Sequence, residues 1–246
     1  MMEVIGLEKS FKDLHALRGV SFTANDGEIT GLIGANGAGK TTTMRMLYTV
    51  MSPDAGRAKV DGFDTMTQRL EVQKRIGVLP DNRGLYPRLT AREHVRYFGR
   101  LHGMRGAELE ARIDQLIEDL EMEDIAERRT KGFSKGQTMK VALARAMIHD
   151  PQNLMFDEPT NGLDIAASRA VRQLIRSLRD RGRAILFSSH IMQEVEALCD
   201  RIAVIAEGSI VAFGTPDELK AATGHQSLED VFMKTAHQTQ LEESVS

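Results

Sequence analysis

Short apolar runs alternate with longer stretches of helical spacing along most of the 246-residue chain. The short runs predict strands and the longer stretches predict helices, and regular alternation of the two predicts an α/β fold. The last two predicted strands are joined by Glu207 and Gly208, a pair typical of a hairpin turn. The predicted strands cover 4–7, 20–24, 28–33, 58–60, 76–79, 153–156, 183–187, 202–205 and 209–213. The predicted helices cover 41–50, 90–102, 108–120, 135–149, 165–181 and 191–198.

The middle of the chain differs from its two ends. Residues 82–150 contain few strand patterns, so we expect a helical insertion there. The α/β pattern occupies 1–81 and 151–220, and 221–246 form a short polar tail whose last fifteen or so residues should be mobile. We therefore expect a single domain over 1–246, in which a helical subdomain interrupts an α/β core.

The composition mainly excludes certain classes of protein. The chain is 41% hydrophobic and 27% charged with a net charge of -3, which suits a soluble globular protein and gives no reason to expect nucleic-acid binding. Cys199 is the single cysteine, so we expect no internal disulfide and a reducing cytoplasm. No signal peptide or membrane-spanning run is apparent. Arg88, Arg92, Arg96 and Arg100 recur at helical spacing and are interpreted as a solvated basic face.

A phosphate-binding loop follows the predicted strand at 28–33. Its sequence, Gly-Ala-Asn-Gly-Ala-Gly-Lys-Thr, fits the P-loop pattern. Its glycines let backbone N–H groups approach a polyphosphate, and the next helix directs its positive end at the anion. Lys40 supplies a charge to the β- and γ-phosphates, and Thr41 supplies a hydroxyl for Mg²⁺. The predicted ATP site comprises Gly34, Ala35, Asn36, Gly37, Ala38, Gly39, Lys40, Thr41 and Thr42.

Two carboxylates end the apolar strand predicted at 153–156. Asp157 and Glu158 would stand beside the P-loop if both strands belong to one sheet. An acid at such a strand end can hold Mg²⁺ through water, and the next acid can take a proton from an attacking water. The pair therefore indicates phosphoryl transfer to water.

The order of the motifs resembles the ATP-binding cassette (ABC) ATPases over about 4–219. The P-loop is followed by Phe-Ser-Lys-Gly-Gln at 133–137, by the acidic strand, by Gly-Leu-Asp at 162–164, and by His190 after a strand. The resemblance implies a P-loop NTPase cassette with a RecA-like α/β core, an N-terminal antiparallel β part and a helical subdomain. It also implies that Asp157 is the Walker B aspartate, Glu158 the general base, and His190 a contact to the γ-phosphate.

Further residues take roles from the same resemblance. Phe11 stands where the family has an aromatic that stacks on adenine, although a core aromatic is the alternative. Ser134, Gly136 and Gln137 match the signature motif, which in this family closes over ATP held by another subunit. Residues 162–164 match the loop that touches that subunit. The resemblance therefore implies a homodimer, or a heterodimer with a related cassette.

The chain departs from the family pattern at three positions. Lys135 replaces a usual glycine and Phe133 a usual leucine of the signature, whose function we expect to survive. Asp81 stands where a glutamine usually begins a flexible loop. Because a carboxylate is a stronger ligand for a hard cation than an amide, Asp81 is predicted to touch Mg²⁺ or its water shell.

The resemblance also implies a membrane partner. In transporters of this family, movement of the cassette passes to an integral membrane permease, and the loop at 81–89 is our candidate for part of the docking surface. The segment 84–93 most resembles the NatA-type sodium exporters, so export of sodium or a drug is expected. Such a chain would be peripheral on the inner face of the cell membrane.

Several other functions compete with this interpretation. One alternative is a soluble ABC ATPase of translation or of iron–sulfur assembly; the translation factors usually carry two cassettes in one chain, whereas this chain has one. DNA-repair cassettes are split by a long coiled coil, and no sustained heptad pattern occurs here. A nucleotide-gated binding module without hydrolysis would not need Glu158 and His190, and a P-loop kinase would lack the signature at 133–137.

Overall fold

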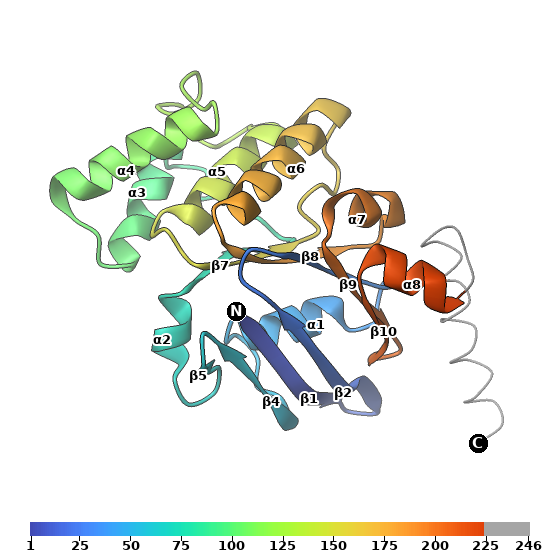
Figure 1. Ribbon diagram of the computed structural model, residues 1–246. Coiled ribbons are helices and arrows are strands. Elements are labelled where there is room, and N and C mark those ends of the chain that lie inside the picture. Colours follow the sequence, from blue (N-terminus) through green and yellow to red (C-terminus); the bar gives the residue numbers. More distant parts are fainter. Residues whose placement is uncertain (224–246) are drawn as a thin grey trace.

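A computed structural model describes residues 1–223 and shows two β-sheets flanked by helices (Figure 1). Most of the predicted tail, and the mobility expected of its last residues, lies outside the described part. None of the helices in residues 1–223 is both long and apolar enough to cross a bilayer.

A six-stranded sheet with the order β10-β9-β3-β8-β7-β6 forms the centre of the molecule. All neighbouring strands are parallel except β9 and β10, which form the predicted hairpin. Every residue of β3, β7 and β8 is buried, as expected for parallel strands covered on both faces. The strands are β3 (Ile29–Ile33), β6 (Ile76–Leu79), β7 (Asn153–Asp157), β8 (Ala184–Ser189), β9 (Arg201–Ala206) and β10 (Ser209–Gly214).

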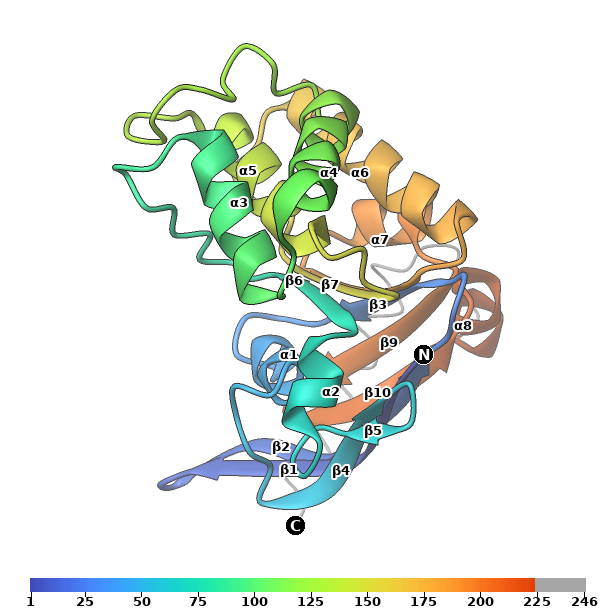
Figure 2. The same ribbon diagram turned by 90° about the vertical axis from the view of Figure 1, so that its left-hand side faces the viewer.

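An antiparallel sheet of order β2-β1-β4-β5 packs near one face of the central sheet. Its strands β1 (Met2–Phe11) and β2 (Leu14–Ala24) are longer than predicted, because hydrogen bonding between the two strands continues past the predicted bounds to the hairpin. Helix α1 (Lys40–Leu47) lies between the sheets (Figure 2) and buries Met44, Met46 and Leu47. The sheet continues through β4 (Ala55–Val60) and the two-residue β5 (Phe63–Asp64), and α2 (Arg69–Gln73) follows; β5 and α2 were not predicted.

The other face of the central sheet is covered by helices. Phe156 and Phe187 from the sheet pack in one cluster with Val141 and Val171 from the helices. Helix α3 begins at a capping box formed by Thr90 and Glu93. These helices are α3 (Ala91–Leu101), α4 (Gly106–Asp119), α5 (Lys135–Met147), α6 (Ile165–Asp180), α7 (Met192–Leu198) and α8 (Pro216–Thr223).

The predicted basic face is wrong for two of its four arginines, and Arg88 lies before α3 begins. Arg92 pairs with Asp114 at 2.5 Å and with Glu127 at 2.6 Å. Arg96 forms a two-pronged pair with Glu110, with nitrogen–oxygen distances of 2.6 and 2.7 Å. The acids come from α4 and the segment after it, so tertiary packing neutralises this part of the face.

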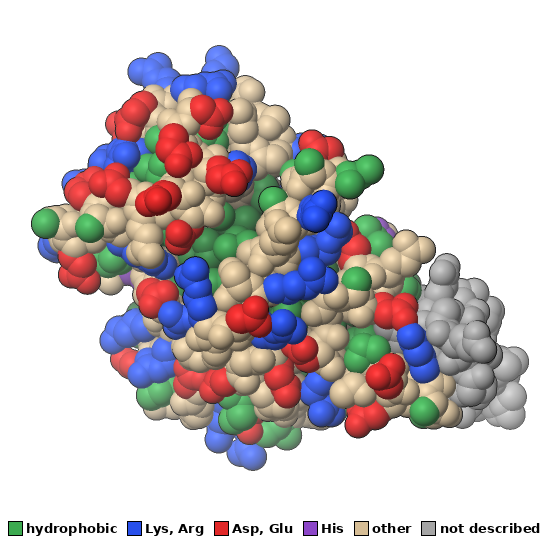
Figure 3. Space-filling view, turned by 45° about the horizontal axis from the view of Figure 1, so that its top comes forward, with side chains coloured by type: hydrophobic (Ala, Val, Ile, Leu, Met, Phe, Trp, Pro, Cys, Tyr) green, Lys and Arg blue, Asp and Glu red, His purple; other side chains and the backbone are tan. Residues whose placement is uncertain are grey.

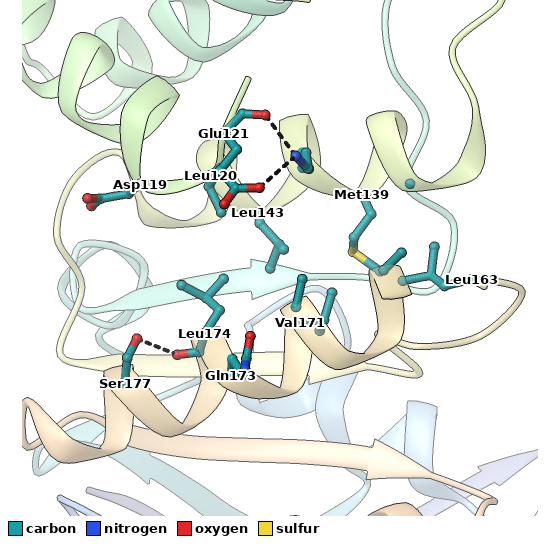
Figure 4. Close-up of a pocket in the computed structure, with 14 residues that line it drawn as sticks. Asp119, Leu120, Glu121, Met139, Leu143, Leu163, Val171, Gln173, Leu174 and Ser177 are labelled. Carbon is teal, nitrogen blue, oxygen red and sulfur yellow. Dashed lines mark hydrogen bonds and ion pairs between the residues drawn. The ribbon is translucent and has the colours of Figure 1, made fainter. Parts of the chain in front are cut away.

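An apolar groove of about 340 Å³ separates α5 from α6. Figure 3 shows hydrophobic side chains at the bottom of a hollow on this side of the molecule, and Figure 4 shows the groove in close-up. Met139 and Leu143 of α5 face Val171 and Leu174 of α6 across it. The groove includes no P-loop residue, although Gly136 of the signature and Leu163 line it, so it is separate from the P-loop of this chain.

Candidate functional site

The carboxyl ends of β3, β7 and β8 bring three distant segments of the chain together. Asp157 of β7 lies opposite Ser188 of β8, and Ser189 lies opposite Ile33 at the end of β3. Ligands of open α/β sheets bind at this edge. A cavity of about 350 Å³ lies there, lined by Asn36, Gly37, Gly39, Lys40, Thr41, Thr42, Asp81, Glu158, Asn161 and His190.

The P-loop geometry depends on glycine at its last turn. Gly39 precedes α1 with a φ of 110°, a left-handed conformation that side chains disfavour. A Cβ at Gly39 would lie 2.5 Å from Leu17 Cδ2. Lys40 follows and is buried, and its Nζ donates to the carbonyl oxygens of Gly34 at 2.7 Å and Ala35 at 3.1 Å. The loop therefore holds the ammonium at the anion-binding end of α1.

Burial lowers the pKa of Lys40, and the carboxylates of Glu158 and Asp157 oppose that shift. The Glu158 Oε1 atom lies 4.0 Å from Lys40 Nζ. Positive and negative groups thus share one half-open cavity, in which an anionic ligand would compete with Glu158 for the ammonium.

Hard oxygen atoms meet at the strand end. The Thr41 hydroxyl donates to Asp157 Oδ2 at 3.0 Å, and the Ser188 hydroxyl donates to Asp157 Oδ1 at 2.5 Å. A hydroxyl and a carboxylate are the ligand types that Mg²⁺ takes beside phosphate oxygens, so these residues fit that cation. Within residues 1–223 no group of three or more His, Cys, Asp or Glu side chains could hold a metal alone. Phosphate and water would therefore have to complete the metal's coordination.

Glu158 and His190 are joined by a hydrogen bond at the cavity wall. His190 Nδ1 lies 2.9 Å from Glu158 Oε2 and must donate, because a carboxylate can only accept. The Glu158 side chain is 13% exposed and that of His190 45%. Glu158 has a φ of 49°, which is unusual for a residue with a side chain. A carboxylate so placed can take a proton from a water in the cavity.

Eight of the predicted residues do not line this cavity. Four of them are still part of its surroundings, since Asp157 bonds Thr41 and the other three belong to the P-loop: Gly34, Ala35 and Ala38. The remaining four lie elsewhere. Phe11 ends β1 at a hairpin and is 43% exposed, which rules out the alternative of a core aromatic. Ser134 and Gln137 form a capping box at the start of α5, with hydrogen bonds of 3.2 and 3.1 Å. Gly136 lies beside Ala167 of α6. The signature residues thus lie apart from the P-loop of their own chain.

Sequence reasoning missed two residues that contact the catalytic strand. Ser188 is the next-to-last residue of the apolar strand β8 and pairs with Asp157 at the end of β7, so a polar residue at that position was a usable signal. Arg83 donates to the backbone carbonyl of Glu158, 75 residues away, and no local pattern marks it.

Comparison with known proteins places this arrangement in a family. The family model described as ABC transporter matches residues 17–161. The ABC transporter ATP-binding protein NatA of Bacillus subtilis is 45% identical over 238 residues, which cover 95% of this chain and 97% of that protein. The Nod factor export ATP-binding protein I of Burkholderia lata is 41% identical over 213 residues, which cover 87% of this chain and 70% of that protein.

Solved structures agree with these relatives. An ATP-binding subunit of an ABC transporter superposes with a TM-score of 0.88 at 30% identity, covering 96% of this chain and 99% of that one. A dimeric bacterial ABC transporter cassette superposes with a TM-score of 0.79 at 25% identity, covering 87% and 98%. The chain therefore belongs to the ATP-binding subunits of ABC transporters, and it is an ATPase.

Proposed function

We propose that two copies of this chain, or one copy and a related cassette, close head to tail over two molecules of Mg-ATP. The support is the separation just described: the P-loop cavity contains Lys40 and Glu158 but not Ser134. The start of α5 has a positive dipole end, which suits a phosphate held by another subunit. The similarity to a dimeric cassette also favours this arrangement.

The proposed reaction is transfer of the γ-phosphoryl group to water. Glu158 orients and deprotonates the water, His190 contacts the γ-phosphate, and Phe11 stacks on adenine. Lys40 binds the β- and γ-phosphates, while Thr41 and Asp157 hold Mg²⁺. The metal, when bound, neutralises charge that develops on the phosphate oxygens. The contacts among Lys40, Glu158 and His190 are the observation on which this proposal depends.

The chain is proposed to act as the motor subunit of an exporter. The core at 1–81 and 151–220 would bind nucleotide, and the helical subdomain at 82–150 would pass its movement to a separate membrane permease. The named function of the Nod factor export relative supports export, with sodium or a drug as candidate cargo. The chain would then lie at the cytoplasmic face of the membrane.

A second groove, of about 620 Å³, suits the permease contact. It lies between α2 and the end of α3, and its wall includes Phe98 and Arg145. Leu70 and Leu101 also line it and are 72% and 64% exposed. Apolar surface of this kind commonly marks a protein contact. We propose that this groove extends the docking surface beyond the loop at 81–89.

Replacing Glu158 with Gln tests the hydrolytic proposal. The amide keeps the side-chain shape but cannot accept the proton, so ATP turnover should fall by about 100-fold or more. The variant should elute as a dimer in Mg-ATP and as a monomer in Mg-ADP. Glu123→Gln, at an exposed acid, is the matched control and should behave as wild type. Undiminished turnover by Glu158→Gln would overturn the proposal.

The membrane role needs a separate experiment. The tagged wild-type chain should copurify with an integral membrane protein. The Leu70→Asp, Leu101→Asp double variant should still hydrolyse ATP but no longer copurify with it. Recovery of the active chain only from the soluble fraction would instead favour a soluble ABC ATPase.

A further inference from the structure

We propose that Arg83 is a positioning residue that holds the backbone of Glu158 and links it to the groove at Phe98 and Arg145. The inference rests on the proposed function, in which Glu158 is the general base. It assigns to the loop at 81–89 a second task besides docking, through a side chain outside the nucleotide cavity.

The contact between Arg83 and the catalytic strand is direct. Arg83 is half-buried, and its Nη2 donates to the carbonyl oxygens of Glu158 at 2.9 Å and Pro159 at 3.3 Å. The Glu158 carbonyl also accepts from Asn161 N at 3.2 Å. Arginine suits this position because a fixed planar group can bond two successive carbonyls, whereas a lysine ammonium has no such fixed geometry.

The backbone of Glu158 requires such support. Its φ of 49° lies in the left-handed region, which persists in a residue with a side chain only when neighbouring contacts fix it. On one side its N–H bonds Ser188 Oγ at 3.0 Å. On the other side its carbonyl is held by Arg83. Loss of Arg83 would leave this carbonyl with the longer bond from Asn161 N alone, and the carboxylate could then turn away from its water.

Arg83 is in turn tied to the second groove. The Arg145 Nη1 atom donates to the carbonyl oxygens of Arg83 at 3.5 Å and Gly84 at 3.4 Å. The guanidinium of Arg145 lies 4.9 Å from the centre of the Phe98 ring, and both residues line the groove. A continuous series of contacts therefore runs from the groove through Arg145 and Arg83 to Glu158. A partner that displaced Arg145 would alter the placement of the base.

The test measures ATP hydrolysis by the full-length chain carrying Arg83→Ala or Arg83→Lys. Because Arg83 does not line the nucleotide cavity, KM for Mg-ATP should stay within about twofold. The kcat of Arg83→Ala should fall between about 10-fold and 100-fold, the range expected when a catalytic group is misplaced. Arg83→Lys should lie between Arg83→Ala and wild type, because it can keep one of the bonds.

Arg88 supplies the matched control, since it is exposed on the same loop and makes no hydrogen bond or ion pair among residues 1–223. Arg88→Ala should keep wild-type kcat and KM. Arg145→Met, which retains packing on Phe98, should lower kcat in the same direction. In the double variant with Arg83→Ala it should lower kcat little further than Arg83→Ala does alone, because both substitutions act through one series of contacts.

Two results would overturn the inference. One is a wild-type kcat for both Arg83 variants; the other is a loss of kcat matched by an equal rise in KM and a lower melting temperature. If Arg83→Ala does not fold, Arg83→Lys decides alone on the same criteria. Failure of wild type to hydrolyse ATP would instead refute the proposed function. If Glu158→Gln loses turnover as expected while Arg83→Ala keeps the wild-type kcat, only this inference is refuted.

Discussion

The hydroxyl of Ser188 should stabilise the fold through the Walker B strand. It donates to Asp157 Oδ1 at 2.5 Å and accepts from Glu158 N at 3.0 Å, and Ser188 is fully buried. A hydrogen bond to a charged group contributes about 1.5–3 kcal/mol. In Ser188→Ala the lost oxygen leaves a space smaller than a water molecule occupies, so solvent should not replace the bond. Glu158 N retains the Ser188 carbonyl at 3.3 Å, so one bond is lost outright.

We therefore expect Ser188→Ala to lower the free energy of unfolding by about 2 kcal/mol. For a chain of this size that corresponds to about 4–8 °C in melting temperature. Differential scanning calorimetry of the nucleotide-free protein measures it. Ser177→Ala is the control, because the Ser177 hydroxyl bonds only the Leu174 carbonyl within α6. A melting temperature for Ser188→Ala within about 1 °C of the control would refute the reasoning.

Three other outcomes follow from the site and its surroundings. Gly39→Ala should abolish ATP binding in a nucleotide titration and destabilise the fold, because its Cβ would clash with Leu17 and its φ is 110°; normal binding would contradict the loop geometry. Asp81→Gln should raise the Mg²⁺ concentration for half-maximal ATPase activity, since Asp81 lines the cavity, and an unchanged Mg²⁺ dependence would remove it from the metal site. Burial lowers the pKa of His94 from 6.5 to about 4, so the unfolded chain protonates first as pH falls. The free energy of unfolding measured in urea should stay the same above about pH 7 and fall from pH 6.5 to 4. In His94→Leu it should fall less over that range, and an equal fall in both proteins would exclude His94 as the cause.

The short elements and the arginine pairs lay beyond sequence reasoning for a common reason. Strand β5 has two residues and α2 has five, which is too short for a periodic pattern to emerge. From its spacing alone Arg96 is predicted to belong to a basic helix face, but in the fold it pairs with Glu110 of α4. In each case the decisive partner lies on another element, and a periodic pattern contains no information about it.

Local patterns were enough to predict the phosphate-binding loop, the acidic strand end and the α/β alternation, because each depends on residues that are close together along the chain. Lys40, Thr41, Asp157 and Glu158 could be predicted from such local patterns. Two contacts became apparent only in the folded chain: Ser188 bonds Asp157 across 31 residues, and Arg83 bonds Glu158 across 75. Those contacts arise from the packing of parallel strands whose ends meet at one edge of the sheet, and their pairing depends on the whole chain at once.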